Sequence, residues 1–386
     1  MVNNITPTIK YIGVDDLDID LFESQYEVPN GMAYNSYLIE EEKIALMDTA
    51  DARKKAEWWA NLEEALAGRK PAYLVAHHME PDHASLIAEV VEKYPEEKVV
   101  ASGRAITMLG NFFPEKNLAD NCMEIQNGDT LELGEHTLTF ISATMVHWPE
   151  VMVSYDSKDK VLFSADGFGK FGALSADEDW ACEARRYYFN ICGKYGAQVQ
   201  RLLKAASALD IQIICPLHGP ILKENLGYYI GLYDTWSKYG VETEGVLIAY
   251  ASIHGGTKAV AEKVAEMFRE KNIGKVAITD LCRDDQAEAI EDAFRMNRLV
   301  LAAASYDASV FPPMYDFIHH LEMKAYQKRK VGIIENGSWA PTAAKTMKKL
   351  LEGLKDIEIV EPTVTIWSRM KESDIPQLQA LVDAMV

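Results

Sequence analysis

Short apolar runs of strand length alternate with longer amphipathic stretches along this chain. The order in which they alternate differs between the part before Gly245 and the part after it. In the first part the strands gather in groups with a helix-like stretch between them. The predicted strands there are residues 37–40, 43–48, 72–76, 137–143, 151–155, 161–164 and 211–215, and the predicted helices are 52–67, a stretch that ends near Tyr94, and 177–208. This mixture predicts an α/β domain that is not a simple alternating sheet.

From Gly245 onward strands and helices alternate strictly. The predicted strands are 246–251, 276–279, 299–304, 331–334 and 358–361, and the predicted helices are 258–271, 313–325, 342–354 and 375–385. Such alternation predicts a doubly wound parallel sheet with helices on both faces. The polar segment 237–244 is the predicted linker, so we expect one domain over residues 1–243 and a second over 244–386.

Charge separates the two parts as well. The 386 residues carry a net charge of −20, of which −18 falls in residues 1–244 and −2 in residues 245–386. A net charge of this sign repels phosphate backbones, so we expect no nucleic-acid partner. We also expect no membrane segment, because no apolar run reaches the roughly 20 residues that a spanning helix needs. The acidic first 20 residues do not resemble an export signal, and a cytoplasmic location is expected.

The five cysteines contain no C-x-x-C pair, which argues against an iron site of the rubredoxin type and against a zinc ribbon. A different cluster offers metal chemistry. His78, Glu80, Asp82 and His83 follow a predicted buried strand within six residues. In a helix these side chains would diverge, whereas on a loop interrupted by Pro81 they can converge. So many titratable groups in one place cost stability unless a cation compensates them.

Three more candidate ligands stand at or near the ends of predicted strands: His147, Asp166 and His218. The pattern H-x-E-x-D-H followed by His, Asp and His resembles the metallo-β-lactamase fold in the variant carried by flavodiiron proteins. The hydrolases of this fold carry H-x-H-x-D-H, so Glu80 marks the difference. Added carboxylate oxygen favours iron over zinc.

The resemblance implies a ligand set for two irons. His78, Glu80 and His147 would hold one iron, Asp82, His83 and His218 the other, and Asp166 would bridge them. His77 and Trp148 are expected to be second-layer neighbours of the site; His77 could also lie at the surface, and Trp148 could shield the iron pocket from water.

A second candidate site lies in the C-terminal part, after its first predicted strand. Small and hydroxyl residues at a turn between a strand and a helix leave backbone N–H groups free to bind a phosphate. This loop consists of Ser252, Ile253, His254, Gly255, Gly256 and Thr257. At that position it resembles the flavodoxin phosphate loop for FMN.

Two further strand ends stand where flavodoxin-like domains surround the flavin ring. They are Ser305, Tyr306, Asp307 and Ala308, and Asn336, Gly337, Ser338 and Trp339. Tyr306 or Trp339 could stack on the ring. The first of these loops departs from the Gly-Ser-Pro-Thr common in flavodiiron proteins.

Together the resemblances imply a metallo-β-lactamase-like αββα sandwich with a diiron centre, joined to a flavodoxin-like domain with FMN. The implied activity is reduction of dioxygen to water, of nitric oxide to nitrous oxide, or of both. The implied donor is rubredoxin, or coenzyme F420 as in archaea. The family assembles as a head-to-tail homodimer, or a dimer of such dimers, which places one chain's flavin beside the other chain's irons.

Two alternatives from other functional classes stay open. One is a zinc-dependent hydrolase with an added flavodoxin-like domain, and Glu80 argues against it. The other is a flavin electron carrier without catalysis, and the seven intact candidate ligands argue against that.

Overall fold

A computed structural model describes residues 2–386, whose contacts divide them into two units. Unit 1 comprises residues up to Tyr188 and Ala197–Asp234, and unit 2 comprises Phe189–Gly196 and Thr235–Val386. The contacts change partners between Asp234 and Thr235, which is ahead of the predicted linker 237–244, so the predicted boundary after residue 243 stays a prediction. None of the helices in residues 2–386 is long and apolar enough to cross a membrane.

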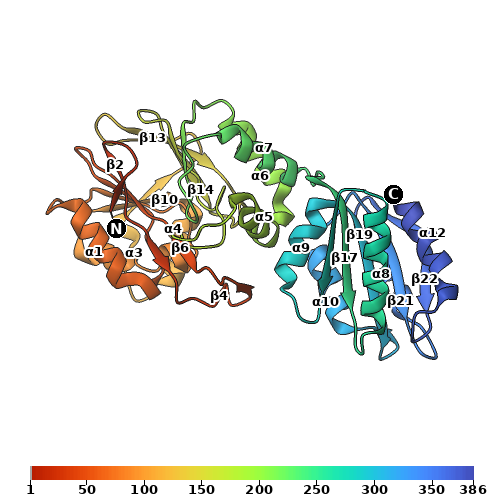
Figure 1. The fold of residues 1–386 in the computed structure, drawn as a ribbon. Coiled ribbons are helices and arrows are strands. Elements are labelled where there is room, and N and C mark those ends of the chain that lie inside the picture. The colour runs from red at the N-terminus through yellow and green to blue at the C-terminus, as the bar shows by residue number, and fades with distance from the viewer. Residues whose placement is uncertain (1) are drawn as a thin grey trace. The chain divides into compact units, whose positions relative to one another are not determined.

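Unit 1 contains two large sheets packed face to face (Figure 1). In spatial order the first consists of β1 (Asn3–Asn4), β2 (Ile9–Tyr11), β7 (Tyr37–Ile39), β8 (Ala45–Met47), β9 (Tyr73–Val75), β10 (Lys98–Ser102) and β11 (Cys122–Ile125). The second consists of β12 (Thr130–Glu132), β13 (Thr137–Ser142), β14 (Met152–Asp156), β15 (Val161–Phe163) and β16 (Ile213–Cys215). Buried side chains from both sheets, among them Met47, Val75, Phe140 and Phe163, form one apolar core.

The remaining elements along residues 2–243 are two small hairpins and a set of helices, and the contacts assign those parts that fall in Phe189–Gly196 or beyond Asp234 to unit 2. Two small hairpins consist of β3 (Val14–Asp16) with β6 (Met32–Tyr34) and of β4 (Leu21–Phe22) with β5 (Tyr26–Glu27). The helices are η1 (Ala52–Lys54), α1 (Lys55–Leu66), α2 (Pro81–Ala84), α3 (Ile87–Lys93), α4 (Gly103–Phe112), η2 (Ala119–Asn121), α5 (Trp180–Ile191), η3 (Gly193–Tyr195), α6 (Gly196–Ala206) and α7 (Leu226–Ser237).

Unit 2 is built on one parallel sheet, with the order β18 (Lys275–Asp280), β17 (Thr243–Ala251), β19 (Met296–Tyr306), β21 (Arg329–Asn336) and β22 (Ile357–Ile366). A short β20 (Ser309–Val310) pairs antiparallel with the end of β19. Numbered within the unit, this order is 2-1-3-4-5, which is that of flavodoxin. The doubly wound parallel sheet predicted from the alternation is therefore confirmed.

Helices cover both faces of that sheet, as the sequence predicted (Figure 1). One face carries α8 (Gly256–Glu270) and α12 (Ile375–Met385), whose residues Val264, Phe268 and Leu381 pack on the strands. The other carries α9 (Gln286–Arg295), α10 (Pro312–Met323) and α11 (Ala343–Leu351). A short helix η4 (Glu372–Asp374) precedes α12. Helix α9 was not predicted, although its buried Ala287, Ile290 and Phe294 follow a helical spacing.

One buried group in unit 1 gives a testable pH dependence of stability. The Glu97 side chain is 1% exposed, and neither carboxyl oxygen has a hydrogen-bond partner in the described chain. Burial raises its pKa to about 8. The folded state therefore keeps the proton to higher pH than the unfolded state does, so this group lowers stability as pH rises from about 4.5 to about 8.

Replacing Glu97 by Gln removes this ionisable group, so E97Q should be more stable than the natural protein, increasingly so as pH rises. Between pH 5 and pH 8.5 the difference in free energy of unfolding should grow by about 3 kcal/mol. Urea unfolding at both pH values measures it. The adjacent Glu96 is exposed, so E96Q is a matched control that should show no such trend. An E97Q difference that is constant with pH would contradict the prediction.

Candidate functional site

The structure brings all seven predicted metal ligands together in unit 1, at the ends of strands from both sheets. His78 and Glu80 follow β9, and Asp82 and His83 lie on α2. His147 lies between β13 and β14, Asp166 follows β15, and His218 follows β16. Because β15 and β16 are parallel neighbours, their carboxyl ends place Asp166 and His218 side by side.

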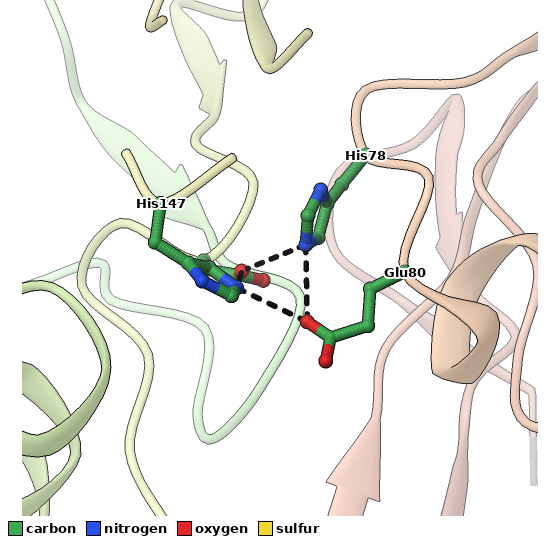
Figure 2. A group of neighbouring side chains, drawn as sticks. His78, Glu80 and His147 are labelled. Carbon is green, nitrogen blue, oxygen red and sulfur yellow. Dashed lines mark hydrogen bonds and ion pairs between the residues drawn. The ribbon is translucent and has the colours of Figure 1, made fainter. Parts of the chain in front are cut away.

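Four of these residues form a first group, whose ligand atoms all lie within 4.8 Å of one another: His78, Glu80, His147 and Asp166. Figure 2 shows the side chains of His78, Glu80 and His147 converging. Glu80 Oε2 lies 3.2 Å from His78 Nε2 and 3.0 Å from His147 Nε2. Asp166 Oδ2 lies 3.3 Å from His78 Nε2 and 3.0 Å from His147 Nε2.

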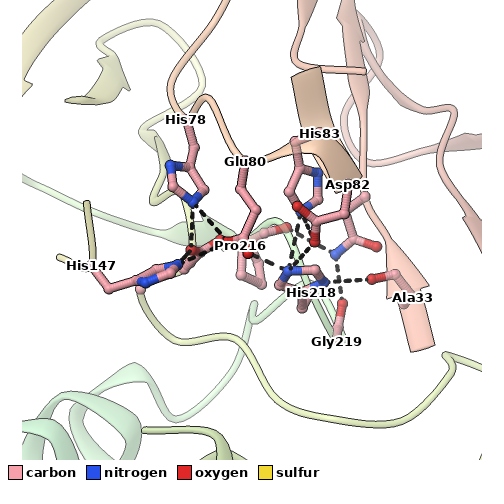
Figure 3. Close-up of polar contacts among 12 residues, drawn as sticks. Ala33, His78, Glu80, Asp82, His83, His147, Pro216, His218 and Gly219 are labelled. Atoms are coloured by element: carbon pink, nitrogen blue, oxygen red, sulfur yellow. Dashed lines mark hydrogen bonds and ion pairs between the residues drawn. The ribbon is translucent and has the colours of Figure 1, made fainter. Parts of the chain in front are cut away.

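Asp82, His83 and His218 form the second group (Figure 3). Asp82 Oδ2 lies 3.4 Å from His83 Nε2 and 3.3 Å from His218 Nε2, and the two imidazole nitrogens are 3.1 Å apart. Asp166 also approaches this group, since its other oxygen, Oδ1, lies 3.8 Å from His218 Nε2. One carboxylate therefore faces both groups, each with a different oxygen.

These separations fit a pair of metal ions. Metal bonds of about 2.1 Å place adjacent ligand atoms about 3 Å apart around one ion. The buried oxygens of Asp82 and Asp166 have no hydrogen-bond partner in the described chain. Buried polar atoms normally have such a partner, so these oxygens are available to bind a metal ion. Burial alone would raise the pKa of Asp166, but His78, His147 and His218 outweigh it and hold this pKa well below its usual range. Asp166 thus offers charged oxygens to cations.

The local conformation differs from the predicted one in a single respect. We expected all four residues of the first cluster on a loop, but Asp82 and His83 lie on α2, a one-turn helix with Pro81 at its first position. Proline is favoured there because its missing N–H is not needed in the first helical turn. The ligands still converge because the helix has only one turn. Asp82 and His83 on the helix point to the second group, and His78 and Glu80 on the preceding loop point to the first.

The two expected neighbours of the ligands lie in different surroundings. His77 is buried, so it does not lie at the surface. Its ring is 2.5 Å from Asp48 Oδ2 and 2.8 Å from Ser154 Oγ, which ties β8, β9 and β14 together. Trp148 is half-buried, and its ring contacts those of His78 and His147, with centroids 5.1 and 6.0 Å away.

Sequence reasoning missed two acidic residues at this site. Glu150, fully buried, accepts a hydrogen bond at 2.8 Å from His78 Nδ1. Glu23, in the turn of the β4–β5 hairpin, lies beside Glu80; partial burial and the Glu80 charge raise the pKa of Glu23 to about 7. A carboxylate three residues after His147 was a usable signal for Glu150. Nothing in the sequence pointed to Glu23, because the small hairpins were not predicted.

In unit 2 the predicted phosphate loop stands between β17 and α8. Gly255 has a left-handed φ of +86°, which favours glycine, and a Cβ built there would meet no atom within 4 Å. The Ser252 hydroxyl accepts a hydrogen bond from the Gly255 N–H at 3.1 Å. The loop is thus shaped by its own contacts and leaves open space at the N-terminus of a 15-residue helix. That arrangement fits a phosphate group.

The other two predicted segments lie at the carboxyl ends of β19 and β21, at the same edge of the sheet, and Ser305, Tyr306 and Asn336 are still strand residues. Asp307 and Ala308 form the turn from β19 to β20, both with positive φ. Tyr306 is 46% and Trp339 87% exposed, so both rings are free to stack on a planar ligand. Ser305 has a structural role, because its hydroxyl accepts from the N–H groups of Thr342 and Ala343.

A fourth loop, after β22, was missed. The Ser368 carbonyl accepts a hydrogen bond from Asn336 Nδ2 at 3.0 Å, and it lies 2.7 Å from where a Cβ of Gly256 would stand. Trp367 is 49% exposed beside it. The known strand order of doubly wound sheets could have indicated this loop, since β22 follows β21 at the same edge.

Comparison with known proteins gives consistent relatives for both units. The model of the ODP family beta lactamase matches residues 32–219, which include all seven candidate ligands. The anaerobic nitric oxide reductase flavorubredoxin of Aliivibrio salmonicida is 27% identical over 353 residues, covering 88% of this chain and 70% of the relative.

Two solved structures share the whole fold. The rubredoxin oxygen:oxidoreductase of Desulfovibrio gigas superposes with a TM-score of 0.93 at 24% identity, covering 100% of this chain and 98% of that one. The flavodiiron protein from Giardia intestinalis also gives 0.93, at 23% identity, covering 100% and 96%. The predicted combination of a metallo-β-lactamase-like and a flavodoxin-like fold is confirmed.

Proposed function

We propose that this chain is a flavodiiron protein that reduces dioxygen to water, nitric oxide to nitrous oxide, or both, with electrons delivered through FMN. The observation that carries the proposal is the position of Asp166, whose two oxygens face the two ligand groups separately. This position suits a pair of metal ions, and the carboxylate of Glu80 in place of an imidazole favours redox-active iron over zinc.

The ligand residues divide this work between them. His78, Glu80 and His147 would hold one iron, Asp82, His83 and His218 the other, and Asp166 would bridge the pair. When bound, the two irons supply the electrons and the open coordination positions for the gas. The protein orients the ligands, and the buried histidines and the Trp148 ring keep bulk water away from the centre.

The loops of unit 2 would hold FMN. The N–H groups at the start of α8, with Ser252 and Thr257, would bind the phosphate, and Tyr306 or Trp339 would stack on the ring. FMN accepts electrons in pairs or singly and so connects a donor to the irons. A donor of the rubredoxin type is favoured, because two of the similar proteins carry the word rubredoxin in their names. Coenzyme F420 stays an alternative donor.

We further propose the head-to-tail homodimer, alone or as a dimer of dimers, that places one chain's FMN beside its partner's irons. A cytoplasmic location belongs to the same proposal. It is supported by the five cysteines, none of which forms a disulfide in residues 2–386, because a reducing compartment keeps cysteines unbridged.

Glu80 should decide which metal the site retains. In E80H the first group would resemble that of the hydrolases, and imidazole in place of a carboxylate oxygen suits zinc better. The variant, purified from medium containing both metals, should hold more zinc than iron, and its gas reduction should fall at least about tenfold. Elemental analysis and anaerobic rates with oxygen and nitric oxide measure both effects. An E80H protein that keeps the natural iron content and rate would show that Glu80 does not select the metal.

The product of oxygen reduction separates the proposed function from a plain flavin carrier. Reduced protein given oxygen should form water without releasing hydrogen peroxide. A flavoprotein without a working metal centre should release peroxide instead, and stoichiometric peroxide from the iron-loaded protein would contradict the proposal.

A further inference from the structure

Glu150 links two of the loops that carry metal ligands. Its Oε1 accepts hydrogen bonds from His78 Nδ1 at 2.8 Å and from the Met79 N–H at 2.9 Å. Its backbone carbonyl accepts from Ser102 Oγ at 2.9 Å, at the end of β10. Since Glu150 follows His147 by three residues, this one side chain connects the loop of His78 and Glu80 to the loop of His147.

The contact also determines which nitrogen of His78 is available. A neutral imidazole carries one N–H, and the carboxylate accepts it at Nδ1. The lone pair of Nε2 is then directed at Glu80 and Asp166, where a metal would be bound. The opposite tautomer would set an Nδ1 lone pair against the Glu150 charge.

The other ligand histidines with a described Nδ1 environment differ. His218 Nδ1 lies 2.8 Å from the neutral carbonyl of Ala33. His83 Nδ1 has no hydrogen-bond partner among the residues that the structure describes. The imidazoles of the second group therefore lack the charged acceptor that His78 has.

We propose that Glu150 is a positioning residue of the metal centre: its buried carboxylate fixes the ring and tautomer of His78 and makes the metal bound there the more electron-rich of the two. This inference rests on the proposed function for the identity of the metals. Negative charge transmitted through a ligand imidazole increases its basicity and so favours the oxidised ion. The two metal positions would then differ in affinity and in reduction potential.

The test replaces Glu150 by Gln, which keeps the size of the side chain and an oxygen that can accept the Nδ1–H. E150Q should bind metal at the first group about 10- to 100-fold more weakly, measured by competition of Fe(II) and Zn(II) with a chelator. Titration followed by electron paramagnetic resonance should show a higher reduction potential for the iron of the first group. Nitrogen-15 spectra of the metal-free protein should show a mixture of His78 tautomers in E150Q in place of the single Nδ1–H form. None of these readouts requires turnover, so they stand even if the gas substrate is wrong.

The chain offers a matched control at the opposite end of β14. Asp156 is likewise fully buried, and its Oδ1 lies 2.9 Å from His136 Nδ1. D156N should lower stability through the same loss of a buried charge, with metal affinity at the seven ligands and potentials unchanged. If E150Q matched D156N, losing stability alone, Glu150 would be only structural. E150D, whose shorter side chain keeps the charge, should recover part of the potential shift, and a potential no closer to that of the natural protein would overturn the role of charge.

Discussion

Replacement of Asp166 by Ala should reduce the rates of oxygen and nitric oxide reduction by about 100-fold or more, because the two oxygens of this carboxylate face the two ligand groups. Without that carboxylate the two ions lose their shared ligand, and three imidazoles lose the charge that they surround. The flavin absorbance should be unchanged, since the FMN loops belong to unit 2, which has its own apolar core. Anaerobic rates and a visible spectrum of the same preparation measure both.

The control for this variant is Asp210→Ala. Asp210 is an exposed carboxylate of the same unit, paired with Lys160 at the surface. D210A should keep the full rate. If D166A also lost its flavin, the two units would not fold independently, and if it retained even a tenth of the natural rate, Asp166 would not be the shared ligand.

Mixing two inactive variants should restore activity if electrons cross between chains. The first variant is D166A, which keeps FMN, and the second is G256V, which keeps the metal ligands. A Cβ at Gly256 would lie 2.7 Å from the Ser368 carbonyl and 3.3 Å from Asn336 Nδ2, so valine should displace the loops and prevent FMN binding. In a head-to-tail dimer the flavin of one variant would stand beside the intact irons of the other.

The expected recovery follows from counting. Random exchange of subunits makes half of the dimers mixed, and each mixed dimer holds one working pair of centres out of two, so activity should reach about a quarter of the natural rate. Coexpression with two different affinity tags isolates the mixed dimer and confirms that it forms. A mixed dimer without activity would mean that each flavin serves the irons of its own chain, and the head-to-tail arrangement would be wrong.

Helices, strands and metal ligands could be predicted from the sequence alone where the signal lies in residues close together along the chain. The strict alternation after Gly245 predicted the parallel sheet of unit 2, and helix α12 was predicted with its observed bounds. The cluster from His78 to His83 was visible because its members lie within six residues, directly after an apolar strand. The hairpins β3–β6 and β4–β5 were not visible, since two- and three-residue strands carry too few positions to show a period.

Only the tertiary structure decided which ligands belong to each of the two groups and how their side chains are oriented. The separation of His83 from His218 is 135 residues along the chain, yet their ring nitrogens are 3.1 Å apart, because strand pairing within the two sheets and packing between them determine which strand ends meet. Which ring nitrogen of His78 faces the other ligands depends on a hydrogen bond to Glu150, 72 residues away in the chain. Residue identity is a local property of the chain, whereas the direction of a lone pair depends on a hydrogen bond that forms only once the fold has brought its partner into contact.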